Sequence, residues 1–209
     1  MKSRDLVFDI GANVGGHVKV FLRFSCRVVA VKPQDFCAAV LDSAFGDRIS
    51  IRQCAISDRV GTPKFYVCDT EVLSSMSKEA IRRTVESSRF AGHRWEAPRM
   101  VEPSTLDALC EVFGQPPFVK IDVEGHKASV LGGLSIPVPL LSFEFAPEIM
   151  QAAFNCLARL QHIAPYRFNY SPFETMEFDL GESASLADVK VHLSLVSKDG
   201  WSDVYTRLQ

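Results

Sequence analysis

The stretch LVFDIGANVGGHVKVFL, residues 6–22, joins an apolar strand, a glycine-rich turn and the start of a helix. In an open parallel sheet, a ligand binds outside the carboxyl ends of the strands, where the strand order reverses. Gly11, Gly15 and Gly16 have no Cβ atom, so the backbone can approach a ligand closely and the helix can begin against the strand. The stretch therefore predicts an α/β fold with a ligand site at the 11–16 turn.

The polarity of this turn narrows the class of ligand. The turn departs from the dinucleotide pattern G-x-G-x-x-G, because Asn13 stands where the middle glycine belongs. Asp9 closes the strand, and a carboxylate repels a pyrophosphate but attracts an amino group or a sulfonium. S-adenosylmethionine carries both cations and no phosphate, so it is the ligand that the turn favours. The alternative is a tight structural turn in which Asp9 caps the helix.

Apolar runs and amphipathic segments alternate through the rest of the chain. Short runs of Val, Ile, Leu and Phe are typical of strands buried on both faces of a parallel sheet. The expected strands are 6–10, 27–31, 49–56, 117–123 and 140–145, and the expected helices are 16–24, 35–45, 104–113, 126–134 and 148–162. YRFNY (166–170), VKVHLSLV (189–196) and SDVYTRL (202–208) alternate more clearly. We expect these three to form an antiparallel part of the sheet.

Length, charge and cysteine content limit the classes of protein to which the chain can belong. Residues 1–209 suffice for one buried core, so we expect a single domain. The 23 Lys and Arg nearly balance the 25 Asp and Glu, which indicates no nucleic-acid partner. The six cysteines form no C-x-x-C pair, which predicts free thiols in a reducing compartment. Because no apolar run reaches roughly 18 residues, we expect no membrane segment and a cytoplasmic location.

Residues 57–103 interrupt the alternation. The stretch SDRVGTPKFYV (57–67) is a hairpin signal, and a substrate-side insertion follows at about residues 69–103. In the insertion, Phe90 and Trp95 are interleaved with arginines, a combination that suits a sugar, phosphate-bearing or glycan acceptor, and Gly92 is a candidate hinge. The arginines are Arg82, Arg83, Arg89, Arg94 and Arg99. A solvated helix and loop without a special role is the alternative.

Charged residues follow each other at two-residue spacing near position 120. Lys120, Asp122 and Glu124 alternate along an apolar strand, so their side chains share one face. In LLSFEF (140–145), Ser142 and Glu144 also share a face. If the two strands adjoin, Asp122 or Glu144 neutralises Lys120, and a buried ion pair is the structural interpretation.

The same residues could instead serve methyl transfer to an alcohol, which needs positioning and the removal of a proton. His126 titrates near neutral pH and is the first candidate for the base, with Asp122 second. Glu124 and Glu144 complete the predicted catalytic group. Three carboxylates could also hold a divalent cation, but Lys120 already supplies positive charge on this face, so we predict no metal.

Six blocks in chain order resemble the FkbM family of S-adenosylmethionine-dependent methyltransferases. They are VFDIGANVGGHV (7–18), VVAVKPQ (28–34), CAISDRVGTPKFYV (54–67), STLDAL (104–109), FVKIDVEGHKASVLGGL (118–134) and LLSFEF (140–145). The resemblance implies a Rossmann-like class I methyltransferase with a mostly parallel seven-stranded sheet, helices on both faces and an antiparallel C-terminal part. It also implies that the 11–16 turn and Asp122 hold the cofactor, with adenine near Gln53 and Ala55. The implied reaction is O-methylation of a hydroxyl on a sugar, a glycan or a natural product.

One residue departs from the family pattern. Where members usually carry a glutamate that accepts hydrogen bonds from both ribose hydroxyls, this chain has Lys32, which can only donate. The lost bonds could cost about 1.5–3 kcal/mol of binding energy.

Lys32 leaves three interpretations open. In the first, the enzyme binds its cofactor more weakly, and Gln34 or Asp35 holds the ribose. In the second, the protein keeps the fold as a binding protein without catalysis. In the third, Lys32 faces the 2′-phosphate of NADP in an oxidoreductase. A homo-oligomer is also open, since no helix precedes the first strand to cover its flank.

Overall fold

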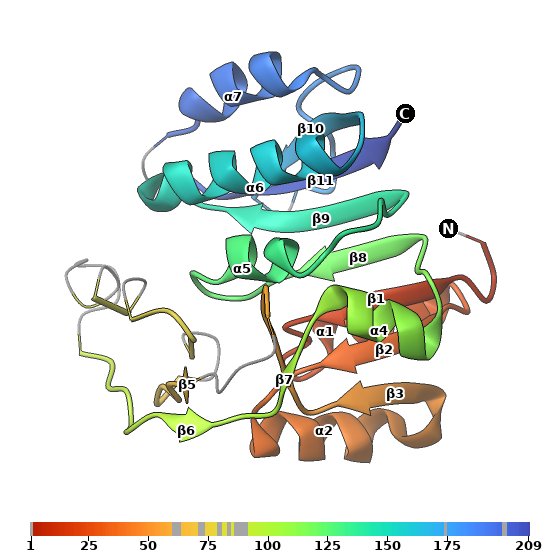
Figure 1. Ribbon diagram of the computed structural model, residues 1–209, viewed down its shortest axis with the longest axis vertical. Helices are drawn as coiled ribbons and strands as arrows, with labels where there is room; N and C mark the ends of the chain where they lie inside the picture. The colour runs from red at the N-terminus through yellow and green to blue at the C-terminus, as the bar shows by residue number, and fades with distance from the viewer. Residues whose placement is uncertain are drawn as a thin grey trace.

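A seven-stranded sheet forms the centre of the computed structural model, with the strand order β10-β11-β9-β8-β1-β2-β3 (Figure 1). The structure describes residues 2–59, 64–70, 74–78, 81–82, 85, 92–173, 175–197 and 200–209. The sheet strands are β1 (Leu6–Ile10), β2 (Arg27–Val31), β3 (Ile49–Arg52), β8 (Phe118–Ile121), β9 (Leu140–Phe145), β10 (Tyr166–Pro172) and β11 (Ser202–Leu208). Neighbouring strands from β3 to β9 pair in parallel, and β11 is antiparallel to both β9 and β10. This arrangement confirms the predicted mixed α/β sheet.

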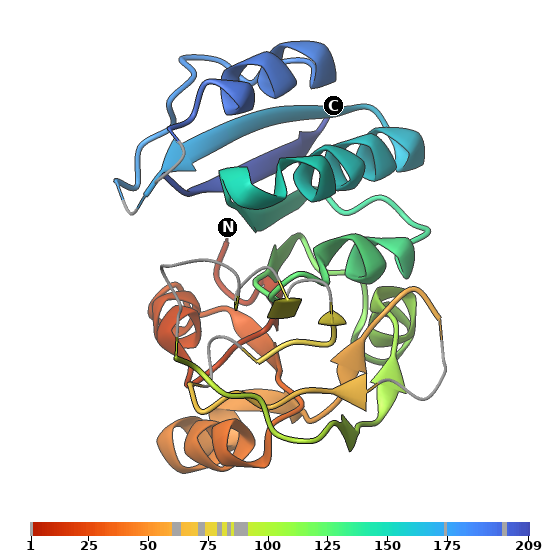
Figure 2. The ribbon, with the colours of Figure 1, turned by 90° about the vertical axis from the view of Figure 1, so that its left-hand side faces the viewer.

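Helices cover both faces of the sheet (Figure 2). On one face lie α1 (Gly16–Arg23) and α2 (Asp35–Phe45), and on the other lie α4 (Leu106–Phe113), α5 (Lys127–Gly132), α6 (Met150–Ile163) and α7 (Leu186–Ser194). Two short 3-10 helices, η1 (Gly46–Arg48) and η4 (Pro147–Ile149), precede β3 and α6. Along β1, Phe8 and Ile10 pack into the core under α4 to α7, whereas Val7 packs into the core under α1 and α2. Burial on both faces explains why β1 is almost continuously apolar.

Two of the expected strands were wrong in part. Residues within 189–196 belong to α7, where the Ser185 hydroxyl accepts a hydrogen bond from the Asp188 backbone N–H at 3.2 Å and caps the helix. Val189 and Leu193, four residues apart, are both fully buried, so the helical period decides the structure. The expected strand 49–56 is split into β3 and β4 (Ala55–Ile56), because β4 leaves the main sheet and pairs with β7 (Pro103–Ser104).

The parallel pair of β4 and β7 is the base of the insertion. Just before the insertion, β5 (Lys64–Phe65) pairs antiparallel with β6 (Arg99–Met100) near the end of the insertion. Figure 1 shows the described part of the insertion beside the end of the sheet at which β1 and β2 point. Arg83, Arg89 and Phe90, on which the acceptor interpretation partly rested, lie outside the described residues.

None of the six cysteines forms a disulfide, as the sequence predicted. None of the helices in the described ranges has the length and apolar character that crossing a membrane requires.

Two of the turn glycines are needed for the fold itself. Gly11 has a φ of 92°, and a Cβ atom there would lie 1.8 Å from the Asp122 carbonyl oxygen. Gly15 has a φ of 87°, and its Cβ would lie 2.4 Å from the Phe45 ring. Gly16 differs, because no heavy atom lies within 4 Å of the Cβ position. The turn therefore combines packing constraints at its first two glycines with open space at the third.

We expect Gly11→Ala and Gly16→Ala to affect stability in opposite directions. Gly11→Ala should lower the free energy of unfolding by about 1–3 kcal/mol for the backbone conformation alone, and the clash with Asp122 adds to this loss. Gly16→Ala is the matched control and should raise the free energy by about 0.4–1 kcal/mol, since alanine restricts the unfolded chain more than glycine does. Urea unfolding measures both, and equal destabilisation would contradict the assignment.

Candidate functional site

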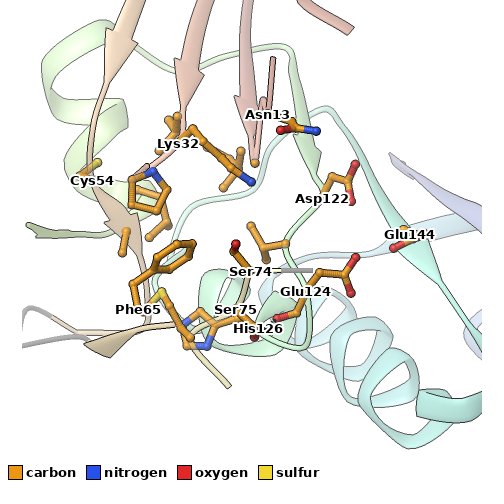
Figure 3. A pocket seen from close by; sticks show the side chains of 18 residues that line it. Asn13, Lys32, Cys54, Phe65, Ser74, Ser75, Asp122, Glu124, His126 and Glu144 are labelled. Atoms are coloured by element: carbon orange, nitrogen blue, oxygen red, sulfur yellow. Dashed lines mark hydrogen bonds between the residues drawn. The ribbon is translucent and has the colours of Figure 1, made fainter. Parts of the chain in front are cut away.

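A cavity of about 230 Å³ lies at the carboxyl ends of the central strands (Figure 3). Its lining comes from the turn after β1, the end of β2, the 54–56 segment, the insertion and the loop after β8. Most of the predicted site residues line it: Gly11, Asn13, Lys32, Ala55, Asp122, Glu124, His126 and Glu144. Although they are described, Asp9, Gly15, Gly16 and Gln53 lie outside this lining.

Asp9 lies in the sheet rather than at the cavity surface. It is 1% exposed, it pairs in register with Lys120 on β8, and neither of its carboxylate oxygens has a hydrogen-bond partner among the described residues. Burial raises the pKa of Asp9 to about 6, although the Lys120 ammonium opposes this shift. Its contact with a cationic ligand stays a prediction, and the acids that line the cavity are Asp122, Glu124 and Glu144.

The conformation of the turn explains the asparagine in the glycine pattern. Asn13 has a φ of 48°, a left-handed conformation that asparagine adopts more readily than most other residues. Its side-chain oxygen accepts a weak hydrogen bond from the Cys37 thiol at 3.6 Å. Asn13 therefore replaces the middle glycine of the dinucleotide pattern without straining the turn, and it presents an amide to the cavity.

Lys32 is the positively charged residue at the position where the family resemblance implies ribose binding. It is 7% exposed and lines the cavity, and Figure 3 shows its ammonium extending toward the side that carries Asn13 and Asp122. The two residues expected to hold the ribose in its place, Gln34 and Asp35, do not line this cavity and have partners within the chain. Gln34 donates to the Ser74 hydroxyl at 3.0 Å, and Asp35 accepts a hydrogen bond from Gln53.

Two ion pairs neutralise part of the acidic cluster after β8. Lys120 Nζ lies 2.9 Å from Asp122 Oδ2, which confirms one of the two pairings expected for Lys120. Glu144 pairs instead with Lys127 at 3.2 Å, a residue that sequence reasoning had not singled out. Burial alone would raise the pKa of Asp122, but the Lys120 and Lys127 ammonium groups outweigh it and hold the pKa below its usual value. Asp122 is therefore ionised and a weak base.

These ion pairs bear on metal binding. One carboxylate oxygen each of Asp122, Glu124 and Glu144 lies within 4.8 Å of the others, a separation that a divalent cation could bridge. However, Asp122 and Glu144 each already contact a lysine ammonium. Two lysine ammonium groups therefore already supply positive charge at this cluster, as the sequence argument from Lys120 expected for one of them.

Glu124 is the acid of this cluster whose pKa suits a general base. Burial raises the pKa of Glu124 to about 7, with Lys127 opposing the shift. The Ser75 hydroxyl donates to the Glu124 backbone carbonyl at 2.6 Å, so the insertion holds this loop directly. Glu124 thus combines a position at the cavity with a pKa near neutrality.

The pKa of His126 is shifted in the opposite direction from that of Glu124. Burial lowers the pKa of His126, although the Asp58 carboxylate opposes this shift. Its Nε2 atom is buried and has no hydrogen-bond partner in the described part of the chain. His126 occupies the N-cap position of α5 but makes no side-chain capping bond. It is therefore a neutral imidazole at the cavity wall.

Sequence reasoning predicted a substrate-side insertion but did not identify the residues there that line the cavity. Phe65, Ser74 and Ser75 lie across the cavity from Asn13 of the glycine turn (Figure 3). Met76 also lines the cavity, and Cys54 lines it from the segment before β4. No local motif marks these residues, because their position depends on the pairing of β4 with β7.

The lining fits S-adenosylmethionine with one exception. The lining holds three acidic residues and one lysine, a balance that favours a ligand with a sulfonium and an ammonium. Val31, Ile56 and Phe65 supply apolar surface for an aromatic base. The exception is Lys32, which cannot accept hydrogen bonds from a ribose.

Comparisons with solved structures bear out the fold. The chain is similar to precorrin-6y C5,15-methyltransferase from Geobacter metallireducens GS-15, with a TM-score of 0.53, 8% identity and coverage of 100% of this chain and 82% of that chain. It is also similar to precorrin 8w decarboxylase from Methanobacterium thermoautotrophicum, with a TM-score of 0.50, 12% identity and coverage of 99% and 83%. At such low identity the likeness shows the Rossmann-like fold alone. No curated protein sequence matches the chain.

A family model gives the assignment. The methyltransferase FkbM domain matches residues 9–167, a range that includes the glycine turn, the acidic cluster and the insertion between them. This range covers most of the 209 residues. The chain therefore belongs to the FkbM family of methyltransferases, and its cofactor is S-adenosylmethionine.

Proposed function

We propose that this methyltransferase acts on a hydroxyl oxygen of a small molecule or a glycan, with Glu124 as the general base. The observation that carries the proposal is a carboxylate at the cavity whose pKa is about 7. An alcohol must lose its proton as its oxygen attacks, and a base is most effective when its pKa lies near the working pH. The near-neutral charge of the chain supports an acceptor other than a nucleic acid.

The other residues of the site position the reactants. S-adenosylmethionine supplies the electrophilic methyl group. Asp122, held ionised by Lys120, supplies fixed negative charge for the cationic end of that cofactor. The pair of Glu144 and Lys127 holds the adjacent wall in place. His126 becomes the second choice for the base, because its lowered pKa makes it a weaker proton acceptor than Glu124.

The insertion forms the acceptor side of this site. Ser75 anchors it to the loop of Glu124, and Phe65 and Met76 present apolar groups to the cavity. A wall of this kind excludes water from the reacting groups and leaves the acceptor to enter along the insertion. The pairing of β4 with β7 connects the two ends of the insertion to the rest of the chain. The insertion and the rest of the chain therefore form one domain in this proposal.

We expect the methyl-transfer rate to rise with pH and to level off above about pH 7. The carboxylate of Glu124 accepts a proton only when ionised, and its pKa is about 7. Glu124→Gln should lower kcat by about 10²–10⁴-fold and remove this pH dependence. His126→Asn is the control and should keep the dependence. Transfer of a labelled methyl group measures both, using an acceptor found by screening hydroxylated sugars, glycans and polyketides. Loss of the dependence in His126→Asn alone would assign the base to His126.

A second prediction concerns Lys32. Lys32→Glu should tighten binding of S-adenosylhomocysteine by about tenfold or more, because a carboxylate regains charged hydrogen bonds to the ribose. Lys32→Met is the control, since it removes the ammonium without adding an acceptor and should give a smaller gain. Isothermal titration calorimetry measures all three proteins.

The same calorimetry separates the proposed function from its alternatives. We expect the unmodified protein to bind S-adenosylmethionine and S-adenosylhomocysteine. Lack of binding by both ligands at millimolar concentration would favour a binding protein that kept the methyltransferase fold. Binding of NADPH in their place would favour an oxidoreductase in which Lys32 faces the 2′-phosphate.

A further inference from the structure

We propose that Cys68, Asp69 and His93 form a zinc site that joins the two ends of the insertion. The Cys68 thiol lies 3.3 Å from Asp69 Oδ1, and His93 Nδ1 lies 2.9 Å from the same oxygen. All three potential ligand atoms lie within 4.8 Å of one another. The cluster is separate from the acids of the cavity and does not depend on the proposed reaction.

The donor atoms decide which metal fits. A thiolate and an imidazole together favour zinc or a similar transition metal, whereas magnesium and calcium prefer oxygen ligands alone. Zinc binds these donors at about 2.0–2.3 Å in a tetrahedron, so its ligand atoms lie about 3.3–3.8 Å apart. The distance from the Cys68 thiol to Asp69, 3.3 Å, equals the lower end of this range, whereas the distance from His93 to Asp69, 2.9 Å, is shorter and would lengthen on zinc binding. Three protein ligands leave the fourth position for water.

The backbone holds these ligands in place. Cys68 and Trp95 form an antiparallel bridge, and the Asp69 N–H donates to the Arg94 carbonyl at 3.0 Å. The Arg94 N–H in turn donates to Asp69 Oδ2 at 3.1 Å. The two halves of the cluster are therefore fixed side by side before any metal binds, although Asp69 and His93 are 24 residues apart in the chain. Such preorganisation lowers the entropic cost of binding.

The cluster is connected to the wall of the cavity. The Cys68 backbone N–H donates to the Ser74 hydroxyl at 2.9 Å, and Gln34 of α2's N-cap donates to the same hydroxyl at 3.0 Å. Ser75, the next residue, holds the loop of Glu124. A metal at Cys68 would therefore stabilise the segment that forms this wall. In this proposal zinc, with water as its fourth ligand, crosslinks two segments of the chain, and methyl transfer stays with the cavity.

Hydrogen bonds alone are the alternative explanation of the cluster. His93 Nδ1 lies within hydrogen-bond distance of both Asp69 and the Thr70 hydroxyl, at 2.9 and 3.2 Å. A protonated network of this kind would need no metal. The two explanations differ in whether the thiol becomes a metal-bound thiolate, which is observable directly.

Titration of the full-length protein with Co²⁺, after treatment with a chelator, tests the proposal. We expect one equivalent to produce visible bands of tetrahedral cobalt and a near-ultraviolet band from the sulfur-to-cobalt charge transfer. Cys68→Ser should lose the charge-transfer band. His93→Gln should weaken binding by more than about tenfold, since losing even a residue that only supports a ligand costs that much. Cys110→Ser removes another free thiol, outside this cluster, and should change nothing.

Limited proteolysis supplies a readout that does not need Cys68 to be replaced. Zinc at one equivalent should slow cleavage within the insertion several-fold in the unmodified protein and in Cys110→Ser, but not in His93→Gln. His93 is partly exposed, so this variant should fold, and circular dichroism checks that it does. Absence of the charge-transfer band in the unmodified protein, or its persistence in Cys68→Ser, would overturn the proposal.

Discussion

The close approach of the first turn to the end of β8 is the constraint on which the site depends. The Asp122 N–H donates to the Ile10 carbonyl at 2.7 Å, and the missing Cβ of Gly11 leaves space for the Asp122 carbonyl oxygen. This contact brings the glycine turn of β1 and the acids after β8 to one cavity, although they are more than 100 residues apart in the sequence. A side chain at Gly11 would separate the two halves of the site.

Several features of the site follow from alternation along strands and could be predicted from the sequence. Because every second residue of a strand shares a face, the pair of Lys120 and Asp122 was predictable from the expected strand 117–123, although β8 itself ends at Ile121. The pair of Lys127 and Glu144 was not, since it depends on how α5 packs over β9. The position of Asp9 inside the sheet could not be predicted either. It depends on the pairing of β1 with β8, which places Asp9 beside Lys120.

The larger errors come from patterns that fit two structures. In VKVHLSLV, apolar residues alternate as in a strand, but Val189 and Leu193 also lie four residues apart as in a helix, and tertiary packing selects the helix. The insertion could be recognised as an interruption of the α/β pattern. Its role as a cavity wall could not, because the bond from Ser75 to the Glu124 carbonyl joins segments 49 residues apart.

The acidic cluster links cofactor binding to the proposed base. Asp203 on β11 lies in register with Glu144 of this cluster. Burial raises the pKa of Glu124 to about 7 and that of Asp203 to about 6, so the lysines do not keep every one of these carboxyl groups ionised. A cation that enters the cavity favours the ionised carboxylate and lowers its pKa. In the proposed function, the sulfonium of the methyl donor is this cation. Donor binding then increases the fraction of Glu124 that is ionised and able to accept a proton.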